Sequence, residues 1–285
     1  MKVLVTGSSG FIGQNLVNAL LKSGHLVHKF TRNEYDKATT VIDTIQPDWV
    51  FNLASYGIHP DQKEVSEMVM VNFANTERLL RACIDVGCVK SFIHTGSCLE
   101  YGPVDHHSTE KDLLKANTTY GYTKALASKV VAELAQRCNI NAITARLYAV
   151  YGPHEAPTRL IPKLIEYGMR EQFPPLVAPE TARDFVYVDD VVEALILLAK
   201  TEDIPRGSAF NVCSESQTTL RELTGLIGNL MGFTAVPNWG SMPAKEWDTN
   251  VWVGDASKMY QTTGWFADTN LVDGLQYTID FYKNK

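Results

Sequence analysis

Short apolar runs alternate with longer amphipathic stretches through the first 150 residues. From Phe11 onward, apolar residues recur every three or four positions as far as Gly24, which predicts a helix with one buried face and a glycine after its last turn. Residues 72–87 and 122–138 have the same helical periodicity. The short runs are rich in β-branched and aromatic residues, which favours strands. The predicted strands are 2–7, 25–31, 49–55, 91–97 and 142–150. Strands that alternate with helices predict a doubly wound α/β fold around a parallel sheet.

The second half of the chain differs in composition, because prolines become frequent after residue 151. The elements predicted there are a helix at 159–170, a strand and helix at 184–200, a strand at 209–214, and helices near 219–232 and 271–283. We expect residues 1–150 to form the larger domain, with 184–214 returning to it. Residues 151–183 and 215–285 are expected to form a smaller, interleaved C-terminal lobe that binds the substrate.

Composition excludes several classes of protein. The 285 residues carry a formal charge of −6, which gives no electrostatic reason to bind nucleic acid or an anionic membrane. No apolar run approaches the roughly 20 residues that a membrane span needs, and the N-terminus does not resemble a signal peptide. Five cysteines without C-x-x-C spacing indicate reduced thiols in a cytoplasmic protein, and no metal site is expected.

A glycine-rich turn joins the first predicted strand to the first helix. Its glycines are Gly7, Gly10 and Gly13, spaced G-x-x-G-x-x-G rather than G-x-G-x-x-G. Glycines at such a turn let the backbone approach a pyrophosphate, whose charge then faces the N-terminus of the helix. Glycine-rich turns also serve only to pack a strand against a helix. The position at the start of an α/β chain favours the nucleotide-binding interpretation, and with it a Rossmann sheet.

The residues after the second strand address the choice between NAD and NADP. An acidic residue at this place accepts a hydrogen bond from the ribose 2′-hydroxyl of NAD, but the chain has Thr31 and Arg32 there. An arginine forms charge-assisted hydrogen bonds with a 2′-phosphate, and Thr31 and Asn33 supply further donors. NADP(H) is therefore the predicted cofactor. The alternative is that Arg32 is a solvated surface charge and that Glu34 or Asp36 supplies the acid.

Three polar residues form a candidate catalytic set. Tyr120 and Lys124 lie four positions apart on a predicted helix, hence on one face. A lysine beside a tyrosine stabilises the phenolate and lowers the tyrosine pKa, so that the tyrosine exchanges a proton with a hydroxyl or carbonyl oxygen. Ser97 follows a buried strand at the sheet edge where ligands bind. Each residue alone has an ordinary explanation, as a solvated helix pair or a turn serine. Their joint occurrence on the expected elements indicates catalysis.

With these residues in place, the chain resembles an extended short-chain dehydrogenase/reductase of the NAD-dependent epimerase/dehydratase superfamily of nucleotide-sugar enzymes. The resemblance covers essentially the whole chain. Its motifs, in family order, are TGSSGFIG, PDWVFNLAS, FIHTGSCLEYG, YGYTK, ARLYAVYGP, ARDFVYVDDVV and FNVCS.

The resemblance implies roles for individual residues. Ser97, Tyr120 and Lys124 match the catalytic triad of the family. The implied cofactor-binding residues are Gly7, Ser9, Gly10, Phe11, Ile12, Gly13, Thr31, Arg32, Leu53, Ala54, Asn72, Tyr120, Lys124, Tyr148 and Val150. Arg183 matches an arginine that contacts the substrate diphosphate, although an ion pair with neighbouring Asp184 is nearly as good an explanation. Arg159 and His154 are candidates for the sugar or phosphate. With Ser97 and Tyr120, Arg159 and Arg183 form the expected substrate-binding set.

Two departures from the family pattern restrict the reaction. Ala149 stands where many relatives have an asparagine that seats the substrate nucleotide, which leaves the pose of the substrate open. No acid pair follows Ser97, which argues against 4,6-dehydration. The leading hypothesis is an NADPH-dependent reductase of a nucleotide-linked 4-keto-6-deoxy-hexose in deoxysugar or polysaccharide biosynthesis. The alternatives are an NAD-dependent 4-epimerase and a dinucleotide-binding sensor without catalysis. The helices at 72–87 and 122–138 resemble those that pair in dimers of the family, so a homodimer is expected.

Overall fold

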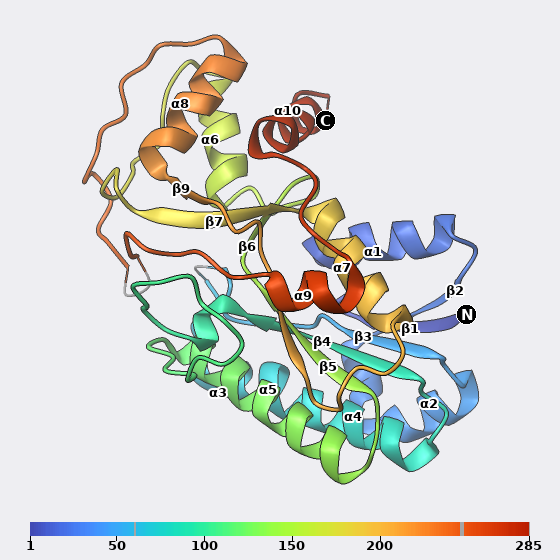
Figure 1. The fold of residues 1–285 in the computed structure, drawn as a ribbon. Coiled ribbons are helices and arrows are strands. Elements are labelled where there is room, and N and C mark those ends of the chain that lie inside the picture. The colour runs from blue at the N-terminus through green and yellow to red at the C-terminus, as the bar shows by residue number, and fades with distance from the viewer. Residues whose placement is uncertain (60, 246–247, 285) are drawn as a thin grey trace.

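The computed structural model of the chain describes residues 1–59, 61–245 and 248–284. Its centre is a six-stranded sheet in which every neighbouring pair is parallel (Figure 1). In spatial order the strands are β2 (Leu26–Phe30), β1 (Lys2–Thr6), β3 (Trp49–Asn52), β4 (Ser91–Ser97), β5 (Ala142–Leu147) and β8 (Ala209–Val212). The strand order reverses direction between β1 and β3, and ligands of such sheets bind beyond the carboxyl ends of the strands at that point. The doubly wound α/β fold predicted from the sequence is confirmed.

Helices cover both faces of this sheet (Figure 1). One face is covered by α1 (Phe11–Lys22) and α7 (Val188–Lys200), and α9 (Ser257–Thr263) packs beside them on β8. The other face is covered by α2 (Ala38–Ile45), α4 (Asn75–Val86) and α5 (Thr119–Arg137). β3, β4 and β5 are buried along their whole length. Burial on both faces explains why these strands appear in the sequence as continuous apolar runs rather than as alternating patterns.

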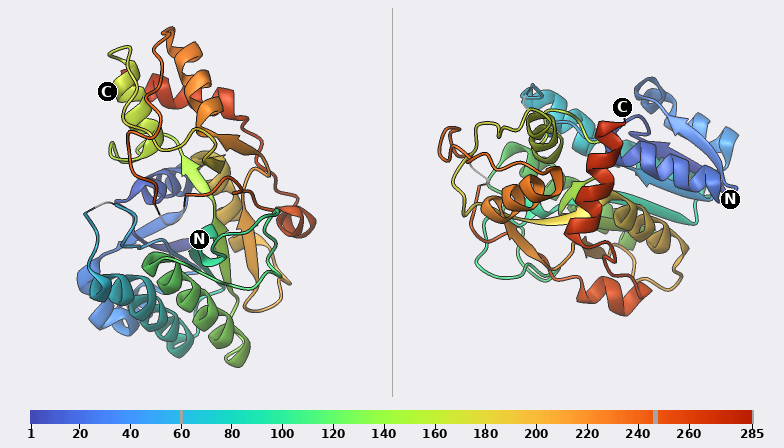
Figure 2. Two further views of the ribbon diagram at one scale, coloured as in Figure 1. Left: turned by 90° about the vertical axis from the view of Figure 1, so that its left-hand side faces the viewer. Right: turned by 90° about the horizontal axis from the view of Figure 1, so that it is seen from above.

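A second, smaller part has its own sheet and core. The sheet consists of β6 (Ala149–Tyr151), β7 (Ala182–Tyr187) and β9 (Gln217–Thr219), with β6 parallel and β9 antiparallel to β7. The helices α6 (Leu160–Gly168), α8 (Leu220–Met231) and α10 (Leu271–Lys283) share a hydrophobic core with it. Figure 2 shows these three helices gathered together, away from the helices that cover the main sheet.

The limits of several elements differ from the predicted ones. The strand predicted at 142–150 is two strands, because the chain turns at Tyr148 and β6 joins the small sheet. β7 also belongs to the small sheet, so residues 184–187 do not return to the main sheet as predicted. The first residues of the helix predicted at 72–87 belong to a π-helical turn at Val69–Ala74, which follows α3 (Val65–Met68), and α4 begins only at Asn75. α5 begins at Thr119, three residues earlier than predicted, because the Thr118 hydroxyl accepts a hydrogen bond from Gly121 N and caps the helix.

Candidate active site

The glycine-rich turn is shaped by close backbone contacts. Gly7 has φ +63°, and a Cβ there would lie 2.8 Å from Ala54 N. A Cβ on Gly13 would lie 2.1 Å from the Gly7 carbonyl oxygen. Both positions therefore need glycine for the turn itself. Gly10 is the N-cap of α1 and provides no side-chain cap, which leaves amide groups of the first helical turn available to an anion.

The segment after β3 is fixed to the end of β1. The amides of Leu53 and Ala54 both donate to Thr6 Oγ1 at 3.0 Å, and Thr6 Oγ1 donates to Asn52 Oδ1 at 2.8 Å. The predicted cofactor-lining residues 53 and 54 thus lie directly beside the glycine turn. Thr6 was not predicted, although it stands in the TGSSG motif immediately before the first glycine.

Asn72 lies in the π-helical turn and uses its whole amide within the protein. Its Oδ1 accepts from Tyr56 N at 2.8 Å and from Ser55 Oγ at 3.4 Å. Its Nδ2 donates to Tyr56 O and to Thr123 Oγ1, both at 2.9 Å. Asn72 thus holds residues 55–56 against α5. Its expected contact with the cofactor stays a prediction.

The residues after β2 include Thr31, which was predicted to bind a 2′-phosphate, and Glu34, the alternative acid for the ribose. The backbone N and Oγ1 of Thr31 donate to the Glu34 carboxylate at 2.5 and 2.7 Å. The same carboxylate contacts His28 Nε2 at 2.9 Å. The hydroxyl proton of Thr31 is thus engaged by Glu34 in this structure, and its role as a donor to phosphate stays a prediction. Glu34, the alternative ribose acid, is in turn occupied by three protein groups.

Arg32, two residues after the end of β2, has a side chain that is free to bind an anion. It is exposed, and it forms no hydrogen bond or ion pair with any residue in the described parts of the chain. Asp36, the other alternative acid, pairs with Arg78 of α4. Both candidate acids therefore have partners within the protein, whereas Arg32 has none among the described residues.

The candidate catalytic residues come from the end of β4 and the start of α5, which pack against each other. Ser97 ends β4, and its Oγ accepts from Leu99 N at 3.2 Å. Tyr120 lies in the first turn of α5, where its hydroxyl is 3.4 Å from Ser55 Oγ. Lys124 follows one turn later and is 1% exposed. Ser55 was not predicted; it belongs to the NLAS segment, whose role was assigned only to residues 53 and 54.

Burial dominates the electrostatics of these groups. It raises the pKa of Tyr120 to about 12, although a hydrogen bond from Ser55 opposes the change. The sequence predicted a lowered tyrosine pKa, so the protein alone shows the opposite direction. Burial also lowers the pKa of Lys124 to about 8, against the attraction of Glu100. Tyr120 is thus a neutral phenol at neutral pH and suits donation of a proton rather than its removal.

A buried carboxylate fixes the backbone at Ser97. Glu100 is fully buried, and its Oε1 accepts from Ser97 N at 2.8 Å while its Oε2 accepts from Arg146 Nε at 3.0 Å. This contact is a capping box, whose sequence signature is a serine followed three residues later by a glutamate. The signature is present in the SCLE motif, so Glu100 was detectable from the sequence although it was not predicted.

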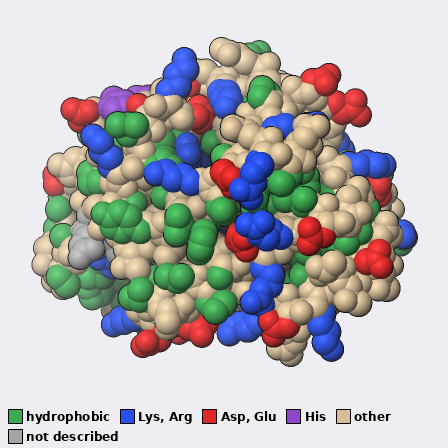
Figure 3. All heavy atoms as spheres, turned by 90° about the horizontal axis from the view of Figure 1, so that it is seen from below, with side chains coloured by type: hydrophobic (Ala, Val, Ile, Leu, Met, Phe, Trp, Pro, Cys, Tyr) green, Lys and Arg blue, Asp and Glu red, His purple; other side chains and the backbone are tan. Residues whose placement is uncertain are grey.

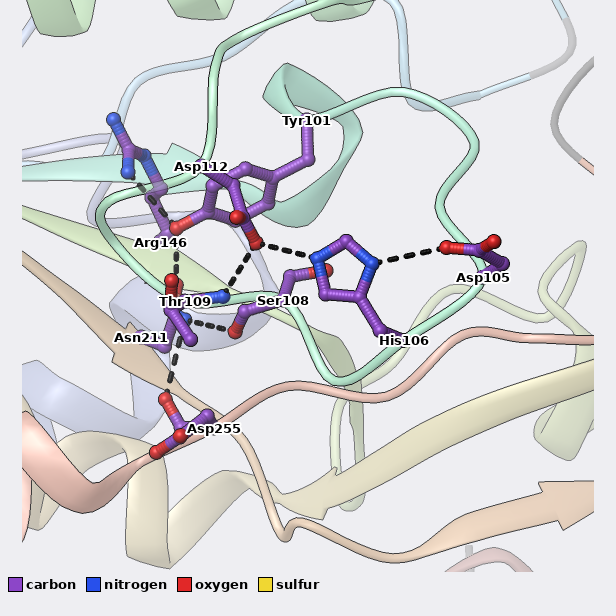
Figure 4. A network of polar contacts seen from close by, with 9 residues as sticks. All are labelled: Tyr101, Asp105, His106, Ser108, Thr109, Asp112, Arg146, Asn211 and Asp255. Atoms are coloured by element: carbon purple, nitrogen blue, oxygen red, sulfur yellow. Dashed lines mark hydrogen bonds and ion pairs between the residues drawn. The ribbon is translucent and has the colours of Figure 1, made fainter.

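The ion pair continues into a network that anchors the loop between β4 and α5 (Figure 4). Arg146 donates to the Tyr101 hydroxyl at 2.9 Å, and that hydroxyl donates to Asn211 Oδ1 at 2.7 Å. Asn211 Nδ2 donates to Ser108 O at 2.8 Å. Further along the loop, His106 lies between Asp105 and Asp112 at 3.1 and 2.9 Å. The loop that separates Ser97 from Tyr120 is thus tied to β5 and β8.

Arg183 faces a different partner from the one considered in the sequence. Its Nη2 donates to Asp248 Oδ1 at 2.5 Å, and its guanidinium lies 4.4 Å above the ring of Trp252. Asp184, the expected partner, instead accepts hydrogen bonds from Ser214 and Gly254 N. Arg183 therefore forms an ion pair, as the alternative predicted, but with Asp248 rather than with Asp184.

The remaining candidates lie on the segment that enters the small lobe. Arg159 Nε is 3.4 Å from Oε1 of buried Glu155, and its positive charge acts on both Tyr120 and Arg183. His154 has φ +72° and stacks edge-on against a ring of α10. Val150 pairs with β7. Tyr148 is buried at the junction between β5 and β6.

Comparison with known proteins agrees with this geometry. The model of a family described as the NAD dependent epimerase/dehydratase family matches residues 3–213, most of the chain. The chain belongs to this family. It is an extended short-chain dehydrogenase/reductase, and an enzyme that depends on a nicotinamide dinucleotide.

Several proteins that resemble the chain are named for nucleotide sugars. A trifunctional UDP-glucose 4,6-dehydratase/UDP-4-keto-6-deoxy-D-glucose 3,5-epimerase/UDP-4-keto-L-rhamnose-reductase of Arabidopsis thaliana is 24% identical over 98% of this chain. The match covers 46% of that relative, so the chain spans about half its length. A UDP-glucose 4-epimerase of Mycolicibacterium smegmatis is 28% identical over 100% of this chain and 99% of its own. The structure of MoeE5 in complex with UDP-glucose and NAD has a TM-score of 0.88 and 29% identity, covering 100% of this chain and 99% of that one.

Among the described residues, no helix is both long enough and apolar enough to cross a membrane.

Proposed function

We propose that the protein is an NADPH-dependent reductase that acts on the 4-keto group of a nucleotide-linked 4-keto-6-deoxy-hexose. The observation that carries the proposal is Arg32, an exposed and unpaired cation where an acid would select NAD. Glu34 and Asp36, which would otherwise accept from the ribose, are occupied by Thr31 and Arg78. A cofactor drawn from the cell as a reductant is typically NADPH.

The catalytic roles in this proposal are those that the family resemblance implies. A bound dihydronicotinamide supplies the hydride. Tyr120, held neutral by burial, donates its proton to the alkoxide oxygen that develops on the sugar. Ser97 donates a hydrogen bond to the same oxygen, and Glu100 keeps the Ser97 backbone in place. Lys124 would hold the cofactor ribose and place a positive charge beside the Tyr120 phenol.

The residues after Ser97 favour reduction over dehydration. Dehydratases of this kind need an acid pair next to the serine or threonine of the triad, and Cys98 and Leu99 stand there. Burial raises the pKa of the Cys98 thiol to about 12. Neither side chain therefore supplies a carboxyl group to remove a sugar hydroxyl as water.

A 4-epimerase that keeps NAD bound is the second candidate. It is supported by the UDP-glucose 4-epimerase of Mycolicibacterium smegmatis and by the NAD in the MoeE5 complex. An epimerase returns the hydride to the opposite face of the same sugar and consumes no reductant. A sensor without catalysis has less support, because Ser97, Tyr120 and Lys124 are all present and come from elements packed together.

Fluorescence titration of the purified protein with NADPH and NADH tests the reductase. We expect a clear NADPH preference that Arg32→Asp reduces by about ten-fold or more, because a charged hydrogen bond contributes about 1.5–3 kcal/mol. Arg206→Asp, in the loop between α7 and β8, is the control with the same charge change. Tyr120→Phe should keep the preference and lose turnover. Copurified NAD without an NADPH preference would instead favour the epimerase.

We also propose that the protein is a homodimer. α3, the π-helical turn after it and α5 pack together and expose large apolar side chains. These are Val65, Val69, Met70, Tyr122 and Leu126, each between 42% and 62% exposed. Val65 and Val69 are four residues apart, as are Tyr122 and Leu126, so each pair lies on one face of its helical segment. Figure 3 shows hydrophobic side chains on the underside of the molecule. Sedimentation equilibrium should give twice the chain mass, and Leu126→Glu should give the monomer. A monomeric wild type at micromolar concentration would contradict the dimer.

A further inference from the structure

The segment between β6 and α6 is fixed in place through its backbone. Asn15 of α1 donates from Nδ2 to the carbonyl oxygen of Pro153 at 3.0 Å. The hydroxyl of Tyr282, on α10, donates to the carbonyl oxygen of Glu155. The segment is thus held between a helix of the main sheet and a helix of the small lobe, and the Glu155 side chain that it carries is buried there, with Glu155 6% exposed.

The Glu155 carboxylate is incompletely paired. Its Oε1 lies 3.4 Å from Arg159 Nε, which is longer than the roughly 2.7–3.2 Å of a regular N–H···O hydrogen bond. Its Oε2 is buried and has no hydrogen-bond partner among the described residues. Burying an ionised carboxylate without a counter-ion is strongly unfavourable. The ionised form of Glu155 therefore depends on Arg159.

Arg159 is much less constrained than Glu155. It is the residue immediately before α6, and 41% of its side chain is exposed. Among the described residues, Glu155 is the one group with which the Arg159 side chain forms an ion pair. The Arg159 charge nevertheless acts on Tyr120, the candidate proton donor, and on Arg183. Arg159 therefore lies within electrostatic range of the candidate active site, on a side chain with room to take another position.

The charges of Arg159 and Arg183 repel each other. Burial lowers the pKa of Arg183, and the charge of Arg159 lowers it further, although Arg183 is paired with Asp248. An anion bound beside both guanidinium groups relieves this repulsion and accepts charge-assisted hydrogen bonds. The diphosphate of a nucleotide sugar is such an anion, and Arg159 and Arg183 are both in the expected substrate-binding set.

The surroundings of Glu155 make it sensitive to the position of Arg159. Burial raises the pKa of Glu155 to about 7, and the charge that opposes this change is that of Arg159. From α10, Tyr282 faces Glu155, but burial raises its pKa to about 12, so it is uncharged at neutral pH. The side chain that α1 contributes is the uncharged Asn15. Neighbouring His154 stacks against Phe281 of α10. If Arg159 moved away, Glu155 would lose its counter-ion and gain none from these elements.

We propose that Glu155 is a positioning residue for Arg159: it holds Arg159 while the site is empty, and it takes up a proton when Arg159 turns to the diphosphate of a bound nucleotide sugar. The proton comes from solvent and ends on the Glu155 carboxylate. The phosphate then compensates the charge of Arg159, and the buried carboxyl group is neutral. This inference rests on the proposed function for the class of substrate, but it depends neither on NADPH nor on the direction of hydride transfer.

Proton uptake fixes the sign of the pH dependence. Below about pH 7 Glu155 already carries its proton, so Arg159 is free to bind phosphate. Above that pH the ionised Glu155 competes with the diphosphate for Arg159. The affinity for a nucleotide sugar should therefore fall as pH rises through about 7, by at most about ten-fold per pH unit, the limit for one proton.

Isothermal titration calorimetry with UDP-glucose and dTDP-glucose tests this coupling. The diphosphate of a nucleotide sugar does not change its ionisation between pH 6 and pH 8, so the ligand itself contributes no proton. Titrations at pH 7.5 in two buffers with different ionisation enthalpies give the number of protons exchanged. We expect the wild type to take up about half a proton for each nucleotide sugar bound.

Three variants connect the uptake to Glu155. Glu155→Gln should abolish it, apart from any contribution of His154, which this variant retains. Its affinity should match that of the wild type at pH 6 and exceed it several-fold at pH 8, because Arg159 has no competitor. Arg159→Gln should bind weakly at both pH values and without the uptake. Glu166→Gln is the matched control, since Glu166 and Arg170 form an exposed pair with the same spacing and should leave binding unchanged.

The outcomes separate this role of Glu155 from the proposed function. Binding without proton uptake, or uptake that Glu155→Gln retains in full, overturns the role and leaves the class of substrate supported. A loss of affinity in Glu155→Gln at both pH values also overturns it, because a purely structural residue would act in that way. Uptake that Glu155→Gln abolishes supports the role even if NADPH is not the cofactor. Failure of both nucleotide sugars to bind overturns this inference together with the class of substrate.

Discussion

Two buried glutamates, one on each side of the site, are held in very different ways. Glu100 lies behind the catalytic serine, and each of its two oxygens has a hydrogen-bond donor, Ser97 N and Arg146 Nε. Glu155 lies on the segment that enters the small lobe, 6% exposed, with Arg159 3.4 Å from one oxygen. Its other oxygen has no hydrogen-bond partner among the described residues.

The difference shows that the two halves of the site are organised to different degrees. Around Ser97, polar groups are paired within the protein, so the serine has one fixed position before any ligand binds. On the side of the small lobe, an ionisable group is buried with incomplete pairing, and Arg159 reaches solvent with 41% of its side chain exposed. Preorganised groups suit transition-state stabilisation, whereas loosely paired groups suit a region that changes partners when substrate binds.

The largest effect should come from breaking the well-paired side. Glu100→Gln leaves the Arg146 guanidinium buried without a counter-charge, and removing one partner of a buried ion pair costs about 3–5 kcal/mol. Urea unfolding at pH 7 should show this loss in the free energy of unfolding. Arg146→Met in the Glu100→Gln background should recover part of the loss, because the uncompensated charge is gone. A loss of less than about 1 kcal/mol in the free energy of unfolding, as for a surface pair, would mean that the Glu100–Arg146 pair does not stabilise the structure around Ser97.

The Ser97 side of the site was also easier to predict from the sequence than the side formed by the small lobe. Ser97, Tyr120, Lys124 and the glycine turn stand on elements set by strong periodicity, and the structure puts them at the carboxyl edge of the main sheet as expected. Glu100 carried a readable local signature, since its contact with Ser97 spans three residues. Contacts between residues a few positions apart can be predicted from a single sequence, because their spacing is visible in it.

Contacts across long separations in the chain were not predictable in the same way. Asp248 lies 65 residues from Arg183, and Trp252 lies 154 residues from Cys98. No periodicity relates such positions, and neighbouring Asp184 offered a simpler partner for Arg183. The engagement of Thr31 by Glu34 was local but missed, because both residues were weighed only as ligands of the ribose and not as partners of each other.

A smaller effect, with a pH dependence, is expected on the loosely paired side. Burial raises the pKa of Glu155 from 4.5 to about 7, and the nearby Arg159 opposes this shift only in part. Between these two values the folded chain holds a proton that the unfolded chain has released, so the contribution of Glu155 to stability falls as pH rises through about 7. Glu155→Gln does not ionise and avoids this loss. We expect the variant to be more stable than the wild type at pH 8, by about 1–3 kcal/mol, and to have no such advantage at pH 5.

Urea unfolding of both proteins at pH 5 and pH 8 measures this difference. Glu166→Gln is the matched control, because Glu166 forms an exposed pair with Arg170 on α6 and should change little at either pH. If Glu155→Gln were instead less stable than the wild type at pH 8, pairing of the ionised Glu155 with Arg159 would outweigh the cost of burying its charge. The contrast with Glu100 would then disappear, because both glutamates would serve as paired structural charges. A gain at pH 8 alone would establish Glu155 as a carboxyl group whose ionisation the fold opposes at a stability cost, on the side of the site expected to bind the substrate.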